Sequence, residues 1–148
     1  MNNKVVFSFV AYIIAEDKEN YHEKHRLQNR YSVFQAELCA IKFAIKYIKE
    51  NSLLSANIFT DSLSSLHAIN NNNSSLRIVN DIQKHLLELD NIGIDVKIVW
   101  IKGHSNIPGN ERADFLAKES LELLTPIHCI NPPLSIAKHI FKQETIEK

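Results

Sequence analysis

The chain has 148 residues, enough for one compact domain and too few for two of ordinary size. A domain of this length buries about 70% of the surface of its unfolded chain, so it can fold without a disulfide or a structural metal. The 17 basic and 17 acidic residues cancel, which argues against a protein that coats nucleic acid by bulk charge but permits a local basic patch. Because no run of about 18 apolar residues occurs, we expect no membrane span.

The two cysteines fit no metal-ligand spacing. Cys39 lies in an apolar helical stretch, which favours a buried, reduced thiol, and Cys129 lies far along the chain. Nothing in this usage requires an oxidising compartment, and we expect an intracellular location, in the cytoplasm or the nucleus.

The N-terminal part of the chain predicts a hairpin. The apolar run Val5–Ala15 is rich in β-branched and aromatic residues, which favours a strand buried on both faces over a signal-peptide core. The polar stretch Glu16–Asn20 then predicts a turn, and weak alternation over Tyr21–Gln28 predicts the return strand.

A long helix is expected next. Ser32 and Gln35 match a capping box, in which each side chain satisfies a backbone N–H at the helix start. Apolar residues follow in steps of four and three, which places them on one helical face, and the helix should end near Glu50. These residues are Phe34, Leu38, Ile41, Ile45 and Ile48.

Strands and helices then alternate, which predicts parallel neighbours and an α/β fold with a mixed sheet. We expect a strand at 56–60, a helix at 62–69, an Asn-rich loop at 70–75, a helix at 76–89 and a strand at 94–101 with at least one buried face. A Gly- and Pro-containing loop at 103–109 precedes a helix that Asn110 caps and that runs to about Leu124. Residues 125–133 should be irregular, with a short helix from Ser135.

Three carboxylates stand out by position. Glu37 borders the apolar stripe of the first helix, Asp61 ends a buried strand where open α/β sheets place ligand sites, and Asp114 lies early in the helix near Asn110. Partly buried carboxylates need partners, and oxygen ligands without cysteine favour hard ions such as Mg²⁺ or Mn²⁺.

Each of these residues also has a simpler interpretation. Asp61 could cap the following helix, Glu37 could lie on a solvated face, and Asp114 could stabilise a helix N-terminus. His104, in the loop after the last strand, could be an ordinary surface residue. Spacing alone does not show that the three carboxylates meet in space.

Three ordered motifs resemble one family. The stretch 99–114 (VWIKGHSNIPGNERAD) resembles the last strand, histidine loop and final catalytic helix of type I ribonuclease H, in the form attached to non-LTR retrotransposon reverse transcriptases. The stretches 34–41 (FQAELCAI) and 59–62 (FTDS) resemble the family's first helix and the strand end with its second Asp. The resemblance covers Val5 to Leu124, and the tail resembles the following linker more weakly.

The resemblance implies a ribonuclease H-like three-layer fold at 1–124 and a linker or tail with a short helix at 125–148. It implies hydrolysis of the RNA strand of RNA–DNA hybrids with two Mg²⁺ or Mn²⁺ ions. Glu37, Asp61 and Asp114 would be metal ligands and catalytic residues, with Glu37 also near a substrate 2′-OH. His104 would assist proton transfer or product release.

The chain departs from the family at one point. The family uses Asp, Glu, Asp and Asp in order, and Glu37, Asp61 and Asp114 match the last three. The first Asp belongs to a central strand before the one at Val5, and no Asp precedes Asp17. We therefore expect a truncated chain that lacks this first, central strand and the ligand that bridges both ions, with impaired activity and a substantial cost in unpaired backbone groups.

Two other functions are open at this point. The chain could be an inactive retroelement remnant that binds nucleic acid weakly. It could also be a structural α/β domain, in which case Asp61→Asn and Asp114→Asn would leave metal binding unchanged. Expected partners are an RNA–DNA hybrid and a reverse transcriptase domain of the same polyprotein, with the chain itself monomeric.

Overall fold

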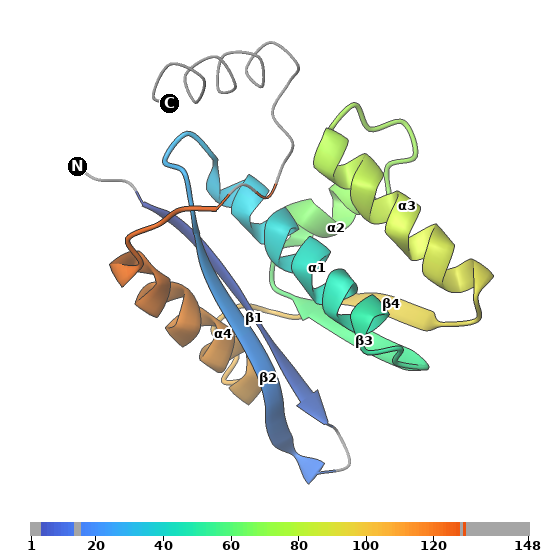
Figure 1. Cartoon of the computed structure of the whole chain (residues 1–148), viewed down its shortest axis with the longest axis horizontal. Helices are drawn as coiled ribbons and strands as arrows, with labels where there is room; N and C mark the ends of the chain where they lie inside the picture. Colours follow the sequence, from blue (N-terminus) through green and yellow to red (C-terminus); the bar gives the residue numbers. More distant parts are fainter. Residues whose placement is uncertain (1–3, 14–15, 128, 130–148) are drawn as a thin grey trace, which may run out of the picture.

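The structure, a computed structural model, describes residues 4–13, 16–127 and 129. Strands and helices alternate after an N-terminal hairpin (Figure 1). In chain order the elements are β1 (Val5–Ile13), β2 (Lys18–Leu27), α1 (Val33–Glu50), β3 (Ser55–Thr60), α2 (Leu63–Ile69), α3 (Arg77–Asn91), β4 (Asp95–Trp100), α4 (Pro108–Glu119) and a 3₁₀ turn, η2 (Ser120–Glu122).

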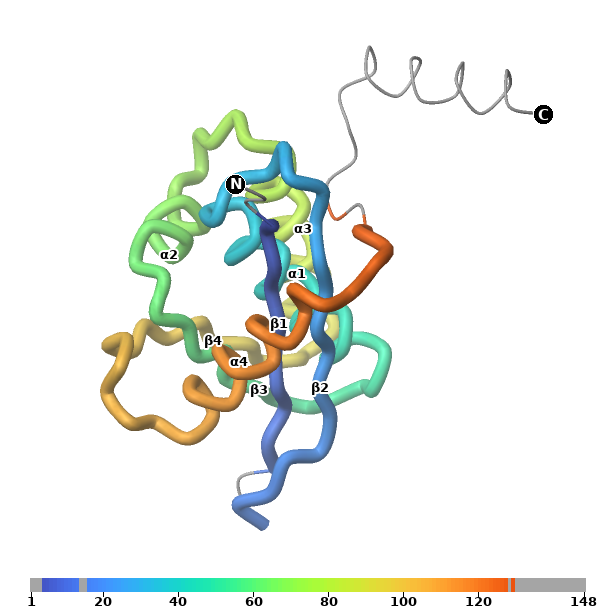
Figure 2. Tube along the Cα trace, turned by 90° about the vertical axis from the view of Figure 1, so that its left-hand side faces the viewer, coloured from blue at the N-terminus to red at the C-terminus, as the bar shows by residue number. Residues whose placement is uncertain are grey.

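Helices cover both faces of the hairpin. α1 packs on one face of β1 and α4 packs on the other, while α3 packs against α1 on the side away from the hairpin. Figures 1 and 2 show this succession of layers from two directions. The arrangement confirms the expected mixed α/β fold with helices on both sides of the strands.

The strands form two pairs within the described part of the chain. β1 and β2 are antiparallel, with Phe7 opposite His25, and β3 and β4 are parallel, with Ile58 opposite Ile98. Each pair is a two-stranded sheet, and no ladder joins β1 to β3 among the described residues. The strand directions are thus mixed as expected, and α1, which contacts both β1 and β3, links the two pairs by packing.

The predicted helix α1 is confirmed at both ends. Gln35 N donates to Ser32 Oγ at 3.1 Å and Ser32 N donates to Gln35 Oε1 at 2.8 Å, so the capping box is complete. Leu38 is fully buried and Ile45 almost so. Burial of each such side chain contributes about 1.5–3 kcal/mol, and this stripe is the centre of the core.

Three predictions about boundaries and burial were wrong. β1 is fully buried on the face of Val5, Phe7 and Phe9 and half-buried on the other, because α4 covers that second face incompletely. On β4, Val96 and Ile98 are half-buried and the remaining residues are exposed. α4 begins at Pro108, since proline suits the first helical position, and its N-cap residue is Ile107 rather than Asn110.

The expected free thiol of Cys39 is also wrong. Cys39 is buried as predicted, but it forms a disulfide with Cys129, their Cα atoms lying 6.0 Å apart. The chain after η2 returns along β2, where Ile127 N donates to the carbonyl oxygen of Arg26 at 2.8 Å. This return places Cys129 beside α1, a proximity that a sequence separation of 90 residues conceals.

The remaining expectations concern the tail and the membrane. The short helix predicted from Ser135 lies outside the described residues. Within the described ranges, no helix is both long and apolar enough to cross a bilayer.

Candidate active site

Asp61 stands immediately after β3, at the edge where the parallel strands β3 and β4 both end. Trp100, the last residue of β4, donates its indole N–H to the backbone oxygen of Asp61 at 3.3 Å. The N-cap of α2 is Ser62, whose hydroxyl accepts from Ser65 N at 3.2 Å. Asp61 is therefore not the helix cap, and its carboxylate is not used to begin α2.

Glu37 reaches this strand end from α1. Its side chain is half-buried, and Ser62 Oγ donates to Glu37 Oε2 at 2.6 Å. Ser62 itself is 6% exposed. Glu37 is therefore turned toward the start of α2, which excludes the interpretation of a purely solvated position.

The loop before α4 and the first turn of α4 both come close to Asp61. Asn110, in the first turn of α4, donates to Asp61 Oδ2 in a long hydrogen bond of 3.4 Å. A Cβ atom at Gly103 would lie 3.3 Å from the same oxygen. The loop thus comes close to the carboxylate at a residue that has no side chain.

Asp114 lies one turn further along α4, half-buried. Partial burial raises the pKa of its carboxyl group, and the negative charges of Asp61 and Glu111 raise that pKa further. The charges of His104 and Lys118 oppose the rise. The charges of Asp61 and His104 therefore both act on the carboxyl group of Asp114, although the three residues come from different segments of the chain.

His104 is exposed at the rim of this group. Its φ of 55° and the φ of 60° at Asn106 place both residues in the left-handed region, where His and Asn are enriched among residues other than glycine. Ser105 Oγ donates to the Lys102 backbone oxygen and closes the turn between them. The loop therefore has a defined conformation that presents His104 to solvent.

The side chains of Glu37, Asp61 and Asp114 all supply carboxylate oxygens, which are ligands that suit a hard divalent cation. The charges of Asp61 and Asp114 also repel each other, and a cation would relieve that repulsion. Among the residues that the structure describes, no three His, Cys, Asp or Glu side chains lie close enough to hold a metal ion as a group. A cation here would complete its shell with water or substrate oxygens, as Mg²⁺ commonly does.

Sequence reasoning missed the residues that hold the carboxylates. Ser62 lies within the stretch 59–62, but its position next to Asp61 gave no sign that it would reach Glu37. Asn110 was interpreted as a helix cap, and its amide instead contacts Asp61. Trp100, on a strand predicted to have at least one buried face, is 45% exposed and contacts the backbone of Asp61.

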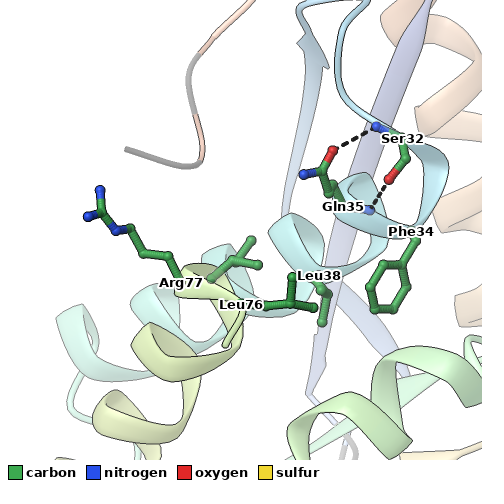
Figure 3. Close-up of a pocket in the computed structure, with 7 residues that line it drawn as sticks. Ser32, Phe34, Gln35, Leu38, Leu76 and Arg77 are labelled. Carbon is green, nitrogen blue, oxygen red and sulfur yellow. Dashed lines mark hydrogen bonds between the residues drawn. The ribbon is translucent and has the colours of Figure 1, made fainter. Parts of the chain in front are cut away.

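A separate pocket lies at the N-terminal ends of α1 and α3. It has a volume of about 250 Å³, and its walls include Phe34, Leu38, Leu76 and Arg77. Figure 3 shows these side chains with the capping box of Ser32 and Gln35 at the edge. None of the three carboxylates lines this pocket, so the pocket is separate from the candidate site.

Comparison with known proteins identifies the family to which the chain belongs and a solved structure with a similar fold. The family model described as RNase H matches residues 2–122. The chain belongs to the RNase H family. Among solved structures, the protease–reverse transcriptase of prototype foamy virus aligns with this RNase H chain at a TM-score of 0.59 and 17% identity, over 82% of this chain and 21% of that one. This RNase H chain thus corresponds to about a fifth of that longer protein. No curated protein matches it.

Proposed function

We propose that this chain is a ribonuclease H domain that hydrolyses the RNA strand of RNA–DNA hybrids with the help of divalent cations. The observation that supports this most directly is that Asp61 is linked to both other carboxylates. Its chain neighbour Ser62 donates a hydrogen bond to Glu37, and its charge acts on Asp114. The match to the RNase H family supports hydrolysis of RNA in RNA–DNA hybrids as the reaction.

The proposed roles follow from these positions. Glu37 and Asp61 would bind one Mg²⁺ or Mn²⁺ ion, and Asp114 would help to hold a second. Two such ions, when bound, would activate water and stabilise the leaving 3′ oxygen. His104, exposed on its turn, would take up or deliver a proton at its imidazole. Glu37 would also contact the 2′-hydroxyl, the group that distinguishes RNA from DNA.

We further propose that activity is weak in the chain as printed, because it supplies three of the family's four carboxylates. The same resemblance supports an origin in a non-LTR retrotransposon reverse transcriptase, with the nuclease unit at 1–124 and a linker at 125–148. The foamy virus protein, a protease–reverse transcriptase, is an example of such a fold within a longer chain.

Cleavage of a labelled RNA–DNA hybrid tests the function. We expect slow, Mn²⁺- or Mg²⁺-dependent cleavage of the RNA strand, no cleavage of duplex DNA, and loss of cleavage in Asp61→Asn. Activity that is unchanged in Asp61→Asn would contradict the proposed site and point to a contaminating nuclease.

A second function is favoured by the lack of a three-ligand group among the described side chains. The chain would then be a remnant that binds hybrid without turnover. Binding of the hybrid, followed for example by a mobility shift, without detectable cleavage at millimolar Mn²⁺ would support this alternative and contradict the first.

A further inference from the structure

We propose that Ser62 is a positioning residue that fixes the carboxylate of Glu37 next to Asp61. This inference rests on the proposed function, since it concerns the same site, and it names a residue whose hydroxyl acts through another side chain. The juxtaposition of Ser62 with the half-buried Glu37 is its basis.

The hydrogen bond is short and shielded from water. Ser62 Oγ and Glu37 Oε2 are 2.6 Å apart, within the range typical of a hydroxyl donating to a carboxylate. Ser62 is 6% exposed, and Ser65, whose hydroxyl lies 2.7 Å from that of Ser62, is fully buried. Little water can therefore compete for the Ser62 hydroxyl.

Besides Glu37, the Ser62 hydroxyl contacts the backbone N–H and hydroxyl of Ser65 and, at 3.3 Å, the hydroxyl of Ser64. As the N-cap of α2 it accepts a hydrogen bond from Ser65 N at 3.2 Å. A serine hydroxyl has one proton and two acceptor positions, so a hydroxyl that accepts from the helix directs its single proton elsewhere. Two acceptors lie within reach of that proton, Glu37 Oε2 at 2.6 Å and Ser65 Oγ at 2.7 Å. The carboxylate of Glu37 is the stronger acceptor because it is charged, and the Ser65 hydroxyl can donate its own proton to Ser62 in return.

The bond from Ser62 restricts the position of the Glu37 carboxylate relative to Asp61. Glu37 and Asp61 come from different parts of the fold. A glutamate side chain has several rotatable bonds, and it binds a metal ion well only if it is held in one conformation. Ser62 is the direct chain neighbour of Asp61, so a bond from Ser62 to Glu37 ties the two carboxylates to one short segment. Such supporting hydrogen bonds commonly account for about 10- to 100-fold in metal affinity.

Three substitutions separate this role from helix capping. Ser62→Ala removes both the donor and the cap. Ser62→Gly removes the donor but retains most of the capping preference, and Ser62→Thr keeps both. Ser32→Ala is the matched control, because Ser32 caps α1 in the same way without contacting any of the three carboxylates.

Two measurements on the whole chain decide the matter. In metal-free protein, carbon relaxation of the Glu37 side-chain methylenes reports their order. Mn²⁺ titration then reports affinity, for which we expect a loss of about tenfold in Ser62→Ala and Ser62→Gly, with Ser62→Thr and Ser32→Ala near wild type. Side-chain order should fall in the same two variants.

Unchanged Glu37 order in both Ser62→Ala and Ser62→Gly would overturn the inference, whether or not the wild-type chain binds Mn²⁺. A drop in order in Ser62→Thr as large as in Ser62→Ala would also overturn it. Neither measurement requires RNA cleavage, so failure of the proposed function would appear separately, as wild-type protein that is as inert toward hybrid as Asp61→Asn.

Discussion

At the scale of single residues, the site depends on charges that repel one another. The negative charges of Asp61 and Glu111 raise the pKa of Asp114. His104 and Lys118 lower that pKa, but the net shift, which includes the effect of burial, is still upward. Like charges are tolerated in folded proteins where a function requires them, and a bound cation would relieve the repulsion. The repulsion between Asp61 and Asp114 disfavours the folded state, and these are two of the residues that we propose bind metal.

Asp114→Asn tests this balance. We expect the free energy of unfolding at neutral pH to rise by about 0.5 kcal/mol, because the cost of partly burying the charge and its repulsion by Asp61 and Glu111 are both removed. We expect Mn²⁺ affinity to fall at least about tenfold. Urea unfolding and Mn²⁺ titration give the two values. Asp95→Asn, at the exposed far end of β4, is the control and should change neither.

A variant with unchanged Mn²⁺ affinity would favour the structural interpretation, in which these carboxylates serve their helices alone. Loss of affinity without a gain in stability would show that neither the partial burial of the Asp114 charge nor its repulsion by Asp61 and Glu111 costs the fold measurable stability.

Tyr21 gives a prediction about pH. Its hydroxyl donates to Glu23 Oε1 at 2.6 Å, and this hydrogen bond, with a smaller contribution from burial, raises the pKa of Tyr21 to about 12. Because the folded pKa lies above the ordinary value of 10.0, the resulting stability is fully present below pH 10 and is lost as the pH rises toward 12. Glu23→Gln should lower the pKa of Tyr21.

Titration of the tyrosine ring carbons by NMR measures this shift, with Glu16→Gln in the exposed hairpin turn as the control. A Tyr21 pKa that is the same in Glu23→Gln and in wild type would show that the hydrogen bond does not cause the rise.

At the scale of elements, the sequence predicted correctly those helix features that depend on residues within the same helix. The capping box of Ser32 and the apolar stripe placed α1 correctly, because both act within a few turns of one helix. The start of α4 was misplaced because Asn110 was interpreted as a cap, whereas proline at Pro108 and a contact with Asp61 decide the geometry. The proximity of Asp61 and Asp114 depends on tertiary packing, which no spacing along the chain encodes.

The approach of the histidine loop to β3 can be tested at Gly103. A methyl group there would lie 3.3 Å from Asp61 Oδ2, which is tighter than ordinary contact. We expect Gly103→Ala to displace this carboxylate and to weaken Mn²⁺ binding several-fold, with a loss of stability of about 1 kcal/mol.

Gly109→Ala is a close control for this variant. Its methyl group would also meet an atom at 3.3 Å, but that atom belongs to the exposed ring of Tyr12. If both variants bound Mn²⁺ equally well, crowding of Asp61 would not matter for the site.

At the scale of the whole molecule, no backbone ladder joins the pair β1–β2 to the pair β3–β4 among the described residues, so packing on α1 holds the two pairs together. α1 contacts both strand pairs and α3, so the core is organised around a helix. The disulfide then ties the returning C-terminal segment to that helix. The sequence could not predict this bond because two cysteines far apart give no information about their distance in space.

Removal of the disulfide should destabilise the entire domain. Because it closes a long loop, we expect Cys129→Ser to lower the free energy of unfolding by about 2–4 kcal/mol. Urea unfolding with and without reductant measures this loss, and reduced wild-type protein should match the variant. A wild-type midpoint that is insensitive to reductant would contradict the expectation.

Trp100 is the single tryptophan of the sequence, and its half-exposed indole is bonded to the backbone of Asp61. Indole emission depends strongly on hydrogen bonding and on access of water, so the protein contains its own optical probe at the strand end. Any ligand that moves Asp61 should change the intensity or wavelength of that emission without an added label. Cation or hybrid binding could therefore be followed in the unmodified chain, in real time and at micromolar concentration.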